Sequence, residues 1–129
     1  MKKISNVLRL ISMAVLLCSG YALAESNIDW IPITGNEHNM IVRGYIDAAG
    51  LDFSKAEYLL FSFGPKGNED CRSMSPINQD GSFYATIRGD VFGETLNFKV
   101  LSSSNEDVFE IEDVIIFEPD STIENLHFK

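Results

Sequence analysis

Apolar and polar residues alternate along most of the chain from residue 39 onward. In the segment 39–47, Met40, Val42 and Ile46 fall on one side of an extended chain, and Tyr45 falls on the other. Successive side chains of a strand point to opposite faces, so alternation of this kind indicates a half-buried β-strand. The first three residues are therefore predicted to face a core, and Tyr45 to face away from it.

The same alternation predicts further strands over 58–63, 71–75, 83–88, 96–101, 108–111, 114–117 and 125–128. The segment 58–63 is apolar at almost every position, which is typical of a central strand covered on both faces. Asn78-Gln79-Asp80-Gly81 has the composition of a turn, and Pro76 and Pro119 are expected to end the strands before them.

Helical spacing is missing after residue 24, and the segment 52–58 is expected to hold a single helical turn at most. About seven short strands separated by frequent turn signals predict an all-β fold, an antiparallel β-sandwich. One domain is expected at this length.

The first 24 residues have the pattern of an export signal. Lys2 and Lys3 supply a positive start, an apolar run occupies 10–18, and Ala22-Leu23-Ala24 has the small residues that a signal peptidase requires. We therefore expect a signal peptide over 1–24, an extended lead-in over 25–38 and a β-sandwich domain over 39–129. Such a protein works in the periplasm or outside the cell, and a Gram-negative bacterium is the expected source.

The whole chain has 10 basic and 19 acidic residues, a net charge of −9. Removal of the leader takes away Lys2, Lys3 and Arg9 and no acid, which leaves a net charge of −12. A chain this acidic repels phosphate backbones, so nucleic acid is excluded as a partner. After the leader no apolar stretch approaches the length of a membrane span, so none is predicted in the mature chain.

Cys18 is removed with the leader, which makes Cys71 the one cysteine of the mature chain. An intramolecular disulfide is thereby excluded, and the thiol is either buried and inert or paired with another chain. We expect the buried form. Acylation of Cys18, as in a lipoprotein, needs a small residue before it, and Leu17 is not small.

Catalytic and metal-binding patterns are missing from the sequence. His38 and His127 are isolated, no Gly-x-Ser-x-Gly elbow is present, and the cysteine and histidine content is too low for a structural zinc site. We therefore predict no enzyme activity, no cofactor and no metal. One alternative stays open, because the loop carboxylates Asp80, Asp90 and Glu94 offer the hard oxygen ligands that calcium prefers.

Aromatic side chains are the remaining candidates for recognition. Trp30, Tyr45 and Tyr84 each combine an apolar ring with a polar tip, the chemistry that serves a carbohydrate platform or a protein interface. Tyr45 and Tyr84 fall on the side of their strands that faces away from the predicted core. We predict these three residues as the binding site, with the alternative that they cover the second sheet face or the domain edge.

Several segments, taken in order, resemble a small immunoglobulin-like β-sandwich module of secreted and surface proteins of bacteria. They are Glu69-Asp70-Cys71-Arg72, Gly81-Ser82-Phe83-Tyr84, Gly89-Asp90, Gly93-Glu94-Thr95-Leu96-Asn97-Phe98-Lys99-Val100 and Ile115-Ile116-Phe117-Glu118-Pro119-Asp120. The resemblance covers roughly 39–125 and implies an accessory, adhesive or spacer unit without catalysis. The chain departs from the pattern at Ser73, where the family has glycine.

Independently of the resemblance, the glycines around Asp90 place Glu94 in a strand connection. Its carboxylate is expected to fix that loop by accepting hydrogen bonds from backbone N–H groups, and to have no catalytic part.

The sequence thus predicts an exported, non-catalytic binding module that recognises a protein partner or a surface polysaccharide. Two alternatives remain. A subunit of a surface filament or multi-protein assembly would exchange strands, with 25–38 or 122–129 donated to a neighbour. An acidic inhibitor would occupy the basic cleft of an enzyme, and its binding would weaken with salt.

Overall fold

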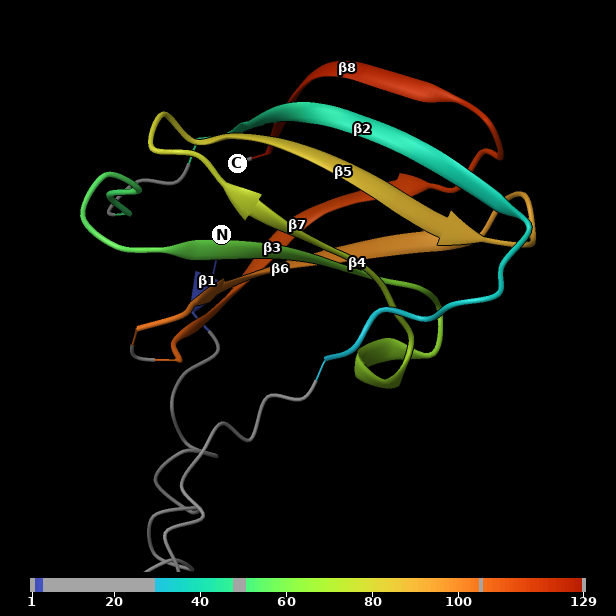
Figure 1. The fold of residues 1–129 in the computed structure, drawn as a ribbon, viewed down its shortest axis with the longest axis horizontal. Helices are drawn as coiled ribbons and strands as arrows, with labels where there is room; N and C mark the ends of the chain where they lie inside the picture. The colour runs from blue at the N-terminus through green and yellow to red at the C-terminus, as the bar shows by residue number, and fades with distance from the viewer. Residues whose placement is uncertain (1, 4–29, 48–50, 105, 129) are drawn as a thin grey trace, which may run out of the picture.

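The computed structural model describes residues 2–3, 30–47, 51–104 and 106–128, which form one curled β-sheet (Figure 1). Its strands are β1 (Lys2–Lys3), β2 (His38–Ile46), β3 (Tyr58–Phe63), β4 (Cys71–Ile77), β5 (Ser82–Gly89), β6 (Thr95–Ser102), β7 (Val108–Ile116) and β8 (Thr122–Phe128). A 3-10 helix, η1 (Gly67–Glu69), lies between β3 and β4. The strands follow the spatial order β1-β7-β6-β3-β4-β5-β2-β8 and bend into a half-barrel. The all-β prediction is confirmed.

Strand β8 runs parallel to β2, whereas the other paired strands of the described sheet are antiparallel. This mixed sheet differs from the wholly antiparallel sandwich expected from the sequence. The Asp120 amide donates to the Asn39 carbonyl at 2.7 Å, and the Ile41 amide donates to the Ser121 carbonyl at 3.0 Å. These bonds place the start of β8 beside the start of β2, so both strands run in the same direction.

The main core fills the inside of the half-barrel, where the alternating residues predicted to face inward are buried. Its members are Met40, Val42, Ile46, Leu60, Ile77, Phe83, Ala85, Ile87, Leu96, Phe98, Val100, Ile111, Ile115, Phe117 and Phe128. The ring centroid of Phe128 lies 5.6 Å from that of Phe83 and 4.7 Å from that of Phe98. These three rings come from β8, β5 and β6, so one core joins distant strands of the sheet.

A second, smaller cluster packs on the opposite side of β3 and is covered by the lead-in. Its buried members are Phe61, Phe63, Cys71, Leu101 and Val108. Trp30 packs against this outer cluster, and the Ile33 amide donates to the Cys71 carbonyl at 2.9 Å. Strand β3 is therefore covered on both faces, as its sequence predicts. The lead-in before residue 30 lies outside the described residues.

Strand β4 continues through Pro76 to Ile77, although the proline is expected from the sequence to end it. The reason is the uneven pairing of β4, which follows β3 along its length but meets β5 at the single pair Ile77↔Phe83. Proline has no N–H to donate, and a strand that is paired mainly on one side tolerates it.

Strand β7 joins the two segments that the sequence predicts as separate strands, 108–111 and 114–117, and ends at Ile116. Its pairing with β6 shifts register between Leu96 and Phe98, which accommodates extra residues of β7 as a bulge. A bulge interrupts the alternation of apolar residues while the strand itself continues. The interruption in the pattern therefore marks a bulge and not a turn.

The predicted leader lies outside the described residues, apart from Lys2 and Lys3. These two form β1, with Lys2 opposite Glu110 and Lys3 opposite Phe109 of β7. Within the part of the chain that the structure describes, no helix combines the length and the apolar character needed to cross a membrane.

Candidate functional site

Tyr45 and Tyr84, two of the three predicted binding residues, lie together on the outward surface of β2 and β5. In the ladder between these strands Tyr84 is opposite Arg43, and Tyr45 is opposite Ser82. This register makes the two tyrosines diagonal neighbours on the same face, within reach of one extended ligand. Tyr45 is 39% exposed and Tyr84 is 50% exposed, so both rings are accessible.

Contacts to neighbouring side chains hold these rings in place. The guanidinium carbon of Arg43 lies 4.8 Å from the ring centroid of Tyr84, and its Nη1 donates to Glu124 Oε1 at 3.3 Å. Tyr45 stacks on His127, with ring centroids 5.4 Å apart and an interplanar angle of 21°. We call these five residues, which come from β5, β2 and β8, the tyrosine face.

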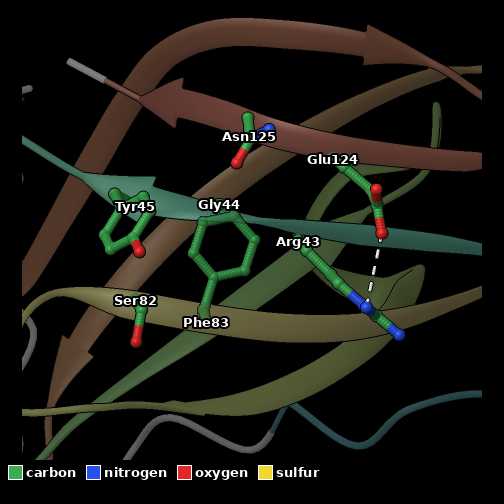
Figure 2. Close-up of a pocket in the computed structure, with 7 residues that line it drawn as sticks. All are labelled: Arg43, Gly44, Tyr45, Ser82, Phe83, Glu124 and Asn125. Carbon is green, nitrogen blue, oxygen red and sulfur yellow. Dashed lines mark hydrogen bonds and ion pairs between the residues drawn. The ribbon is translucent and has the colours of Figure 1, made fainter.

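A groove of about 280 Å³ opens within the tyrosine face (Figure 2). Its lining residues are Arg43, Gly44, Tyr45, Ser82, Phe83, Glu124 and Asn125. In Figure 2 the side chains of Arg43 and Glu124 extend toward each other across it from β2 and β8. The groove therefore presents a cation, a carboxylate and an aromatic ring close together.

The groove exists because β8 carries a bulge opposite Gly44. The register passes from Val42↔Ile123 to Gly44↔Leu126, and Asn125 in the bulge adopts a φ of +58°. A Cβ at Gly44 would lie 2.0 Å from the Leu126 carbonyl oxygen, so no other residue fits that close approach of the two strands. Bulges of this kind re-aim side chains at strand edges.

His127 links the tyrosine face to the end of β2. Its Nδ1 lies 3.3 Å from Asp47 Oδ2, and both side chains are well exposed, at 52% and 62%. The carboxylate orients the imidazole, and the imidazole supports the ring of Tyr45 from one side. Tyr45 itself lines the groove.

Trp30, the third predicted binding residue, lies apart from the tyrosine face. Its ring meets the edges of Phe61 and Phe63 with centroid distances of 5.0 and 4.9 Å, and Lys99 Nζ lies 5.5 Å from its centroid. Burial lowers the pKa of that lysine, and the nearby charge of Glu110 opposes the effect. Trp30 is therefore engaged in packing over the outer cluster, and the structure does not bring it together with the two tyrosines.

A buried polar cluster centred on Arg72 is the other concentration of charge, and sequence reasoning missed it. The register of β4 against β3 shifts between Ser62 and Phe63, which leaves Arg72 at a bulge. Its side chain is 6% exposed and crosses to β5, where Nη1 donates to the Arg88 carbonyl at 3.0 Å. The guanidinium thus occupies the place where β4 and β5 separate.

All five N–H groups of the Arg72 guanidinium have acceptors. Nε and Nη2 donate to the two Asp70 oxygens at 2.7 and 3.2 Å, and Nη1 and Nη2 donate to the two Glu94 oxygens at 3.0 and 2.8 Å. The Arg88 carbonyl takes the remaining one. A guanidinium has five donors in a fixed fork, so none is left to bind a ligand. The cluster is a structural brace.

Two glycines make room for this guanidinium. A Cβ at Gly64 would lie 2.5 Å from Arg72 Nη2, and a Cβ at Gly89 would lie 2.8 Å from Nη1. Asp70, Arg72, Gly89 and Glu94 all belong to the segments on which the family resemblance was drawn. Three of the five segments, 69–72, 89–90 and 93–100, thus meet at one buried ion cluster.

The ionisation of the cluster follows from its geometry. Burial raises the pKa of Asp70, but the hydrogen bonds from Arg72 and from the Lys66 amide outweigh burial and leave that pKa below its ordinary value. The hydrogen bonds to Glu94 and Asp70 raise the pKa of Arg72 against the opposing effect of burial. The Glu94 carboxylate was predicted to accept hydrogen bonds from backbone N–H groups of its loop, but its partner is the Arg72 guanidinium.

The other carboxylates considered for calcium are also engaged. Asp80 accepts hydrogen bonds from the Ser82 amide and hydroxyl, which close the 78–81 turn. Asp90 accepts from the Asn36 side chain and from the Glu37 amide. Among the residues described here, no three histidines, cysteines or acids gather in the way a metal ion requires.

Cys71 is buried, as predicted, and is 1% exposed. Burial raises the pKa of its thiol to about 11, and its Sγ lies 3.6 Å from the Ser73 carbonyl oxygen. The imidazole of His38 lies beside Asp120, with 3.7 Å between Nδ1 and Oδ2. A neutral, enclosed thiol of this kind is a poor nucleophile.

No protein-family model matches this chain, and no curated protein matches it either. Its function therefore has to be inferred from the tyrosine face itself. Arg43 could also have been predicted as part of that face, because it falls on the outward side of an alternating strand. Glu124 and His127 could not have been predicted from the sequence, since their approach to β2 depends on the parallel pairing of β8.

Proposed function

We propose that this protein is an exported, non-catalytic binding module that recognises a neutral polysaccharide through the tyrosine face. The observation that carries the proposal is the pair of exposed, diagonal tyrosines that both neighbour Arg43, which is ion-paired with Glu124. Flat rings stack on the apolar faces of sugar rings, and charged groups beside them bind hydroxyls.

Rigid presentation supports this function. The two tyrosines stand on regular paired strands, one ring is stacked on His127 and the other lies against Arg43. A ligand that binds such a surface orders few side chains, which keeps the entropic cost of binding low.

The chemistry of the face favours a neutral sugar over an acidic polymer or a large protein surface. The mature chain has a net charge of −12, which repels acidic polysaccharides. Stable protein interfaces have a dehydrated apolar centre, whereas the tyrosine face alternates single rings with charged groups. Polar groups between aromatic rings are suited to the many hydroxyls of a sugar chain.

The cellular setting belongs to the same proposal. The leader pattern over 1–24 supports export to the periplasm or the exterior. The immunoglobulin-like relationship remains a prediction that rests on the segments around Arg72. A surface module that binds a glycan is consistent with both.

The test is affinity electrophoresis of the exported protein in gels that contain a β-1,4-glucan, a β-1,3-glucan or a mannan. At least one of these neutral polymers is expected to retard the wild-type protein. Loss of one stacked ring costs about 1 kcal/mol, so Tyr84→Ala and Tyr45→Ala should each weaken the apparent affinity roughly fivefold.

The matched control is Phe92→Ala, because Phe92 is 68% exposed and lies in the loop between β5 and β6, outside the tyrosine face. It should leave retardation unchanged, and circular dichroism should show all variants folded. Equal retardation of wild type and Tyr84→Ala, or mobility unaffected by every polymer, contradicts the proposal.

A further inference from the structure

Strand β7 lies at one end of the long sheet, and its outer edge carries the two-residue strand β1. The pairing is antiparallel, with Lys2 opposite Glu110 and Lys3 opposite Phe109. In the structure itself, therefore, this edge accepts an extended segment from a remote part of the chain by main-chain pairing. The opposite edge, on β8, has no further strand among the described residues.

β1 belongs to the predicted leader, so cleavage after residue 24 removes it. The backbone groups of Phe109 and Glu110 that face β1 then lose their partners. An unpaired strand edge is a template for another strand, and it favours a segment of matching side chains.

The side chains of β7 select the charge of that segment. Glu110, Glu112 and Asp113 are exposed along the strand, and so are Val114 and Ile116, at 54% and 46%. Acids on an edge strand disfavour an acidic neighbour and favour a basic one, because opposite charges across a strand pair are stabilising. The segment seated on the edge in this structure has two consecutive lysines.

A second copy of this chain is a poor occupant by the same reasoning. Antiparallel pairing of two β7 strands would set Glu110 and Glu112 of one copy near the same acids of the other. Pairing with a β8 edge would bring Glu124 to the acids of β7, and two mature chains of net charge −12 repel each other. The charge pattern therefore admits a basic partner and discourages self-association.

We propose that the β7 edge of the processed protein binds an extended segment of a partner protein that carries lysine or arginine, by antiparallel strand addition. This site goes beyond the proposed glycan function and occupies the other end of the sheet. Backbone pairing supplies the affinity, and the acids of β7 supply the preference for basic sequences.

The experiment uses the protein purified after export, with its N-terminus established by mass spectrometry. The probe is a fluorescent peptide of residues 1–9, measured by anisotropy. It should bind saturably, and the double variant Glu110→Lys/Glu112→Lys should weaken binding at least tenfold. The control Glu37→Lys reverses the charge of one exposed glutamate before β2, which is half the charge change of the double variant, and should change the affinity less than twofold.

A second probe separates strand pairing from charge attraction. The same peptide with methylated backbone nitrogens at Lys2 and Lys3 keeps both charges but cannot donate its amides to β7. Its binding should be lost, and amide hydrogen exchange should show that the unmodified peptide protects residues of β7.

Equal binding of the methylated peptide would overturn the proposal, as would an unchanged affinity in the double variant. Recovery of the protein with Met1 still attached would also overturn the proposal, because β1 would then still occupy the edge. A dimer that the double variant abolishes would assign the edge to a second copy instead. Tyr84→Ala should leave peptide binding intact and the double variant should leave glycan retention intact, so each proposal fails separately.

Discussion

Arg72 shows how a single charged residue becomes part of the interior. A guanidinium taken out of water is costly unless opposite charges and hydrogen bonds replace the lost solvation. Here Asp70 and Glu94 each contribute both carboxylate oxygens, and a main-chain carbonyl completes the set. Gly64 and Gly89 provide the space. The buried guanidinium requires the two carboxylates for its charge and the two glycines for its space, and the carboxylates in turn require the guanidinium.

Arg72→Met is expected to lower the free energy of unfolding by ~3–5 kcal/mol, because it leaves two carboxylates near one another without their cation. Urea denaturation followed by circular dichroism measures the loss. The control Arg88→Met removes an exposed arginine from β5 while its carbonyl stays in place, and should cost under about 0.5 kcal/mol.

A milder variant is needed in case Arg72→Met does not fold. Glu94→Gln keeps an acceptor for Nη1 but loses one charge, so its cost should fall between those of the two arginine variants. Equal stability of Arg72→Met and Arg88→Met would show that the cluster does not brace the sheet.

At the scale of elements, β8 determines the shape of the tyrosine face. Its parallel pairing brings Glu124 beside Arg43 and His127 beside Tyr45. The bulge opposite Gly44 then opens the groove between them. Within β8, the residue with an unusual backbone conformation is Asn125, whose φ is +58°.

The conformation of Asn125 gives a test of the bulge. Asn125→Gly should change the free energy of unfolding by less than about 0.5 kcal/mol, because glycine adopts positive φ without strain. Asn125→Val should cost ~1–2 kcal/mol, because a β-branched residue is strained in the left-handed region. Amide hydrogen exchange in β8 should be faster in the valine variant alone; identical exchange in both would contradict this account of the bulge.

At the scale of the whole molecule, the main core and the outer cluster lie on the two sides of the shared strand β3. Leu60 belongs to the main core and Phe61 to the outer cluster, and Phe128 ties the far strand β8 into the main core. The strands are hydrogen-bonded in series from β7 to β8. The two clusters are therefore expected to unfold together.

Trp30 makes this cooperativity measurable, because it is the one tryptophan in the sequence and packs on the outer cluster. The urea midpoint from tryptophan fluorescence should coincide with the midpoint from far-ultraviolet circular dichroism, as two-state unfolding requires. Trp30→Ala should lower the shared midpoint, with a cost of ~3–5 kcal/mol at most for a partly buried ring. A fluorescence transition at clearly lower urea would mean that the lead-in detaches before the sheet unfolds.

Much of the fold could be predicted from local pattern. The inward residues of β2 and the strands β5 and β6 were predicted from alternation. The double coverage of β3 was predicted from its continuous apolar run. The boundaries were less accurate where the pairing pattern is irregular. Pro76 lies within β4 because that strand is paired mainly on one side, and a bulge divides the apolar pattern of β7.

The site was predicted in part. Tyr45 and Tyr84 were found because outward aromatic residues are visible in an alternating strand. Trp30 was grouped with them because a sequence does not show which side of a sheet a lead-in will cover.

By itself, the sequence determined the class of structure, the identity of most core positions and the acidity of the surface, because these depend on residue type and short-range spacing. Only the tertiary structure decided that β8 runs parallel to β2, that Arg72 reaches Glu94, and that Glu124 meets Arg43. Those contacts join residues far apart in the chain, and they depend on strand direction, register and bulges. Alternation is the same in either direction along a strand, so it carries no information about strand direction. It shows which face a residue takes but not which strand lies beside it.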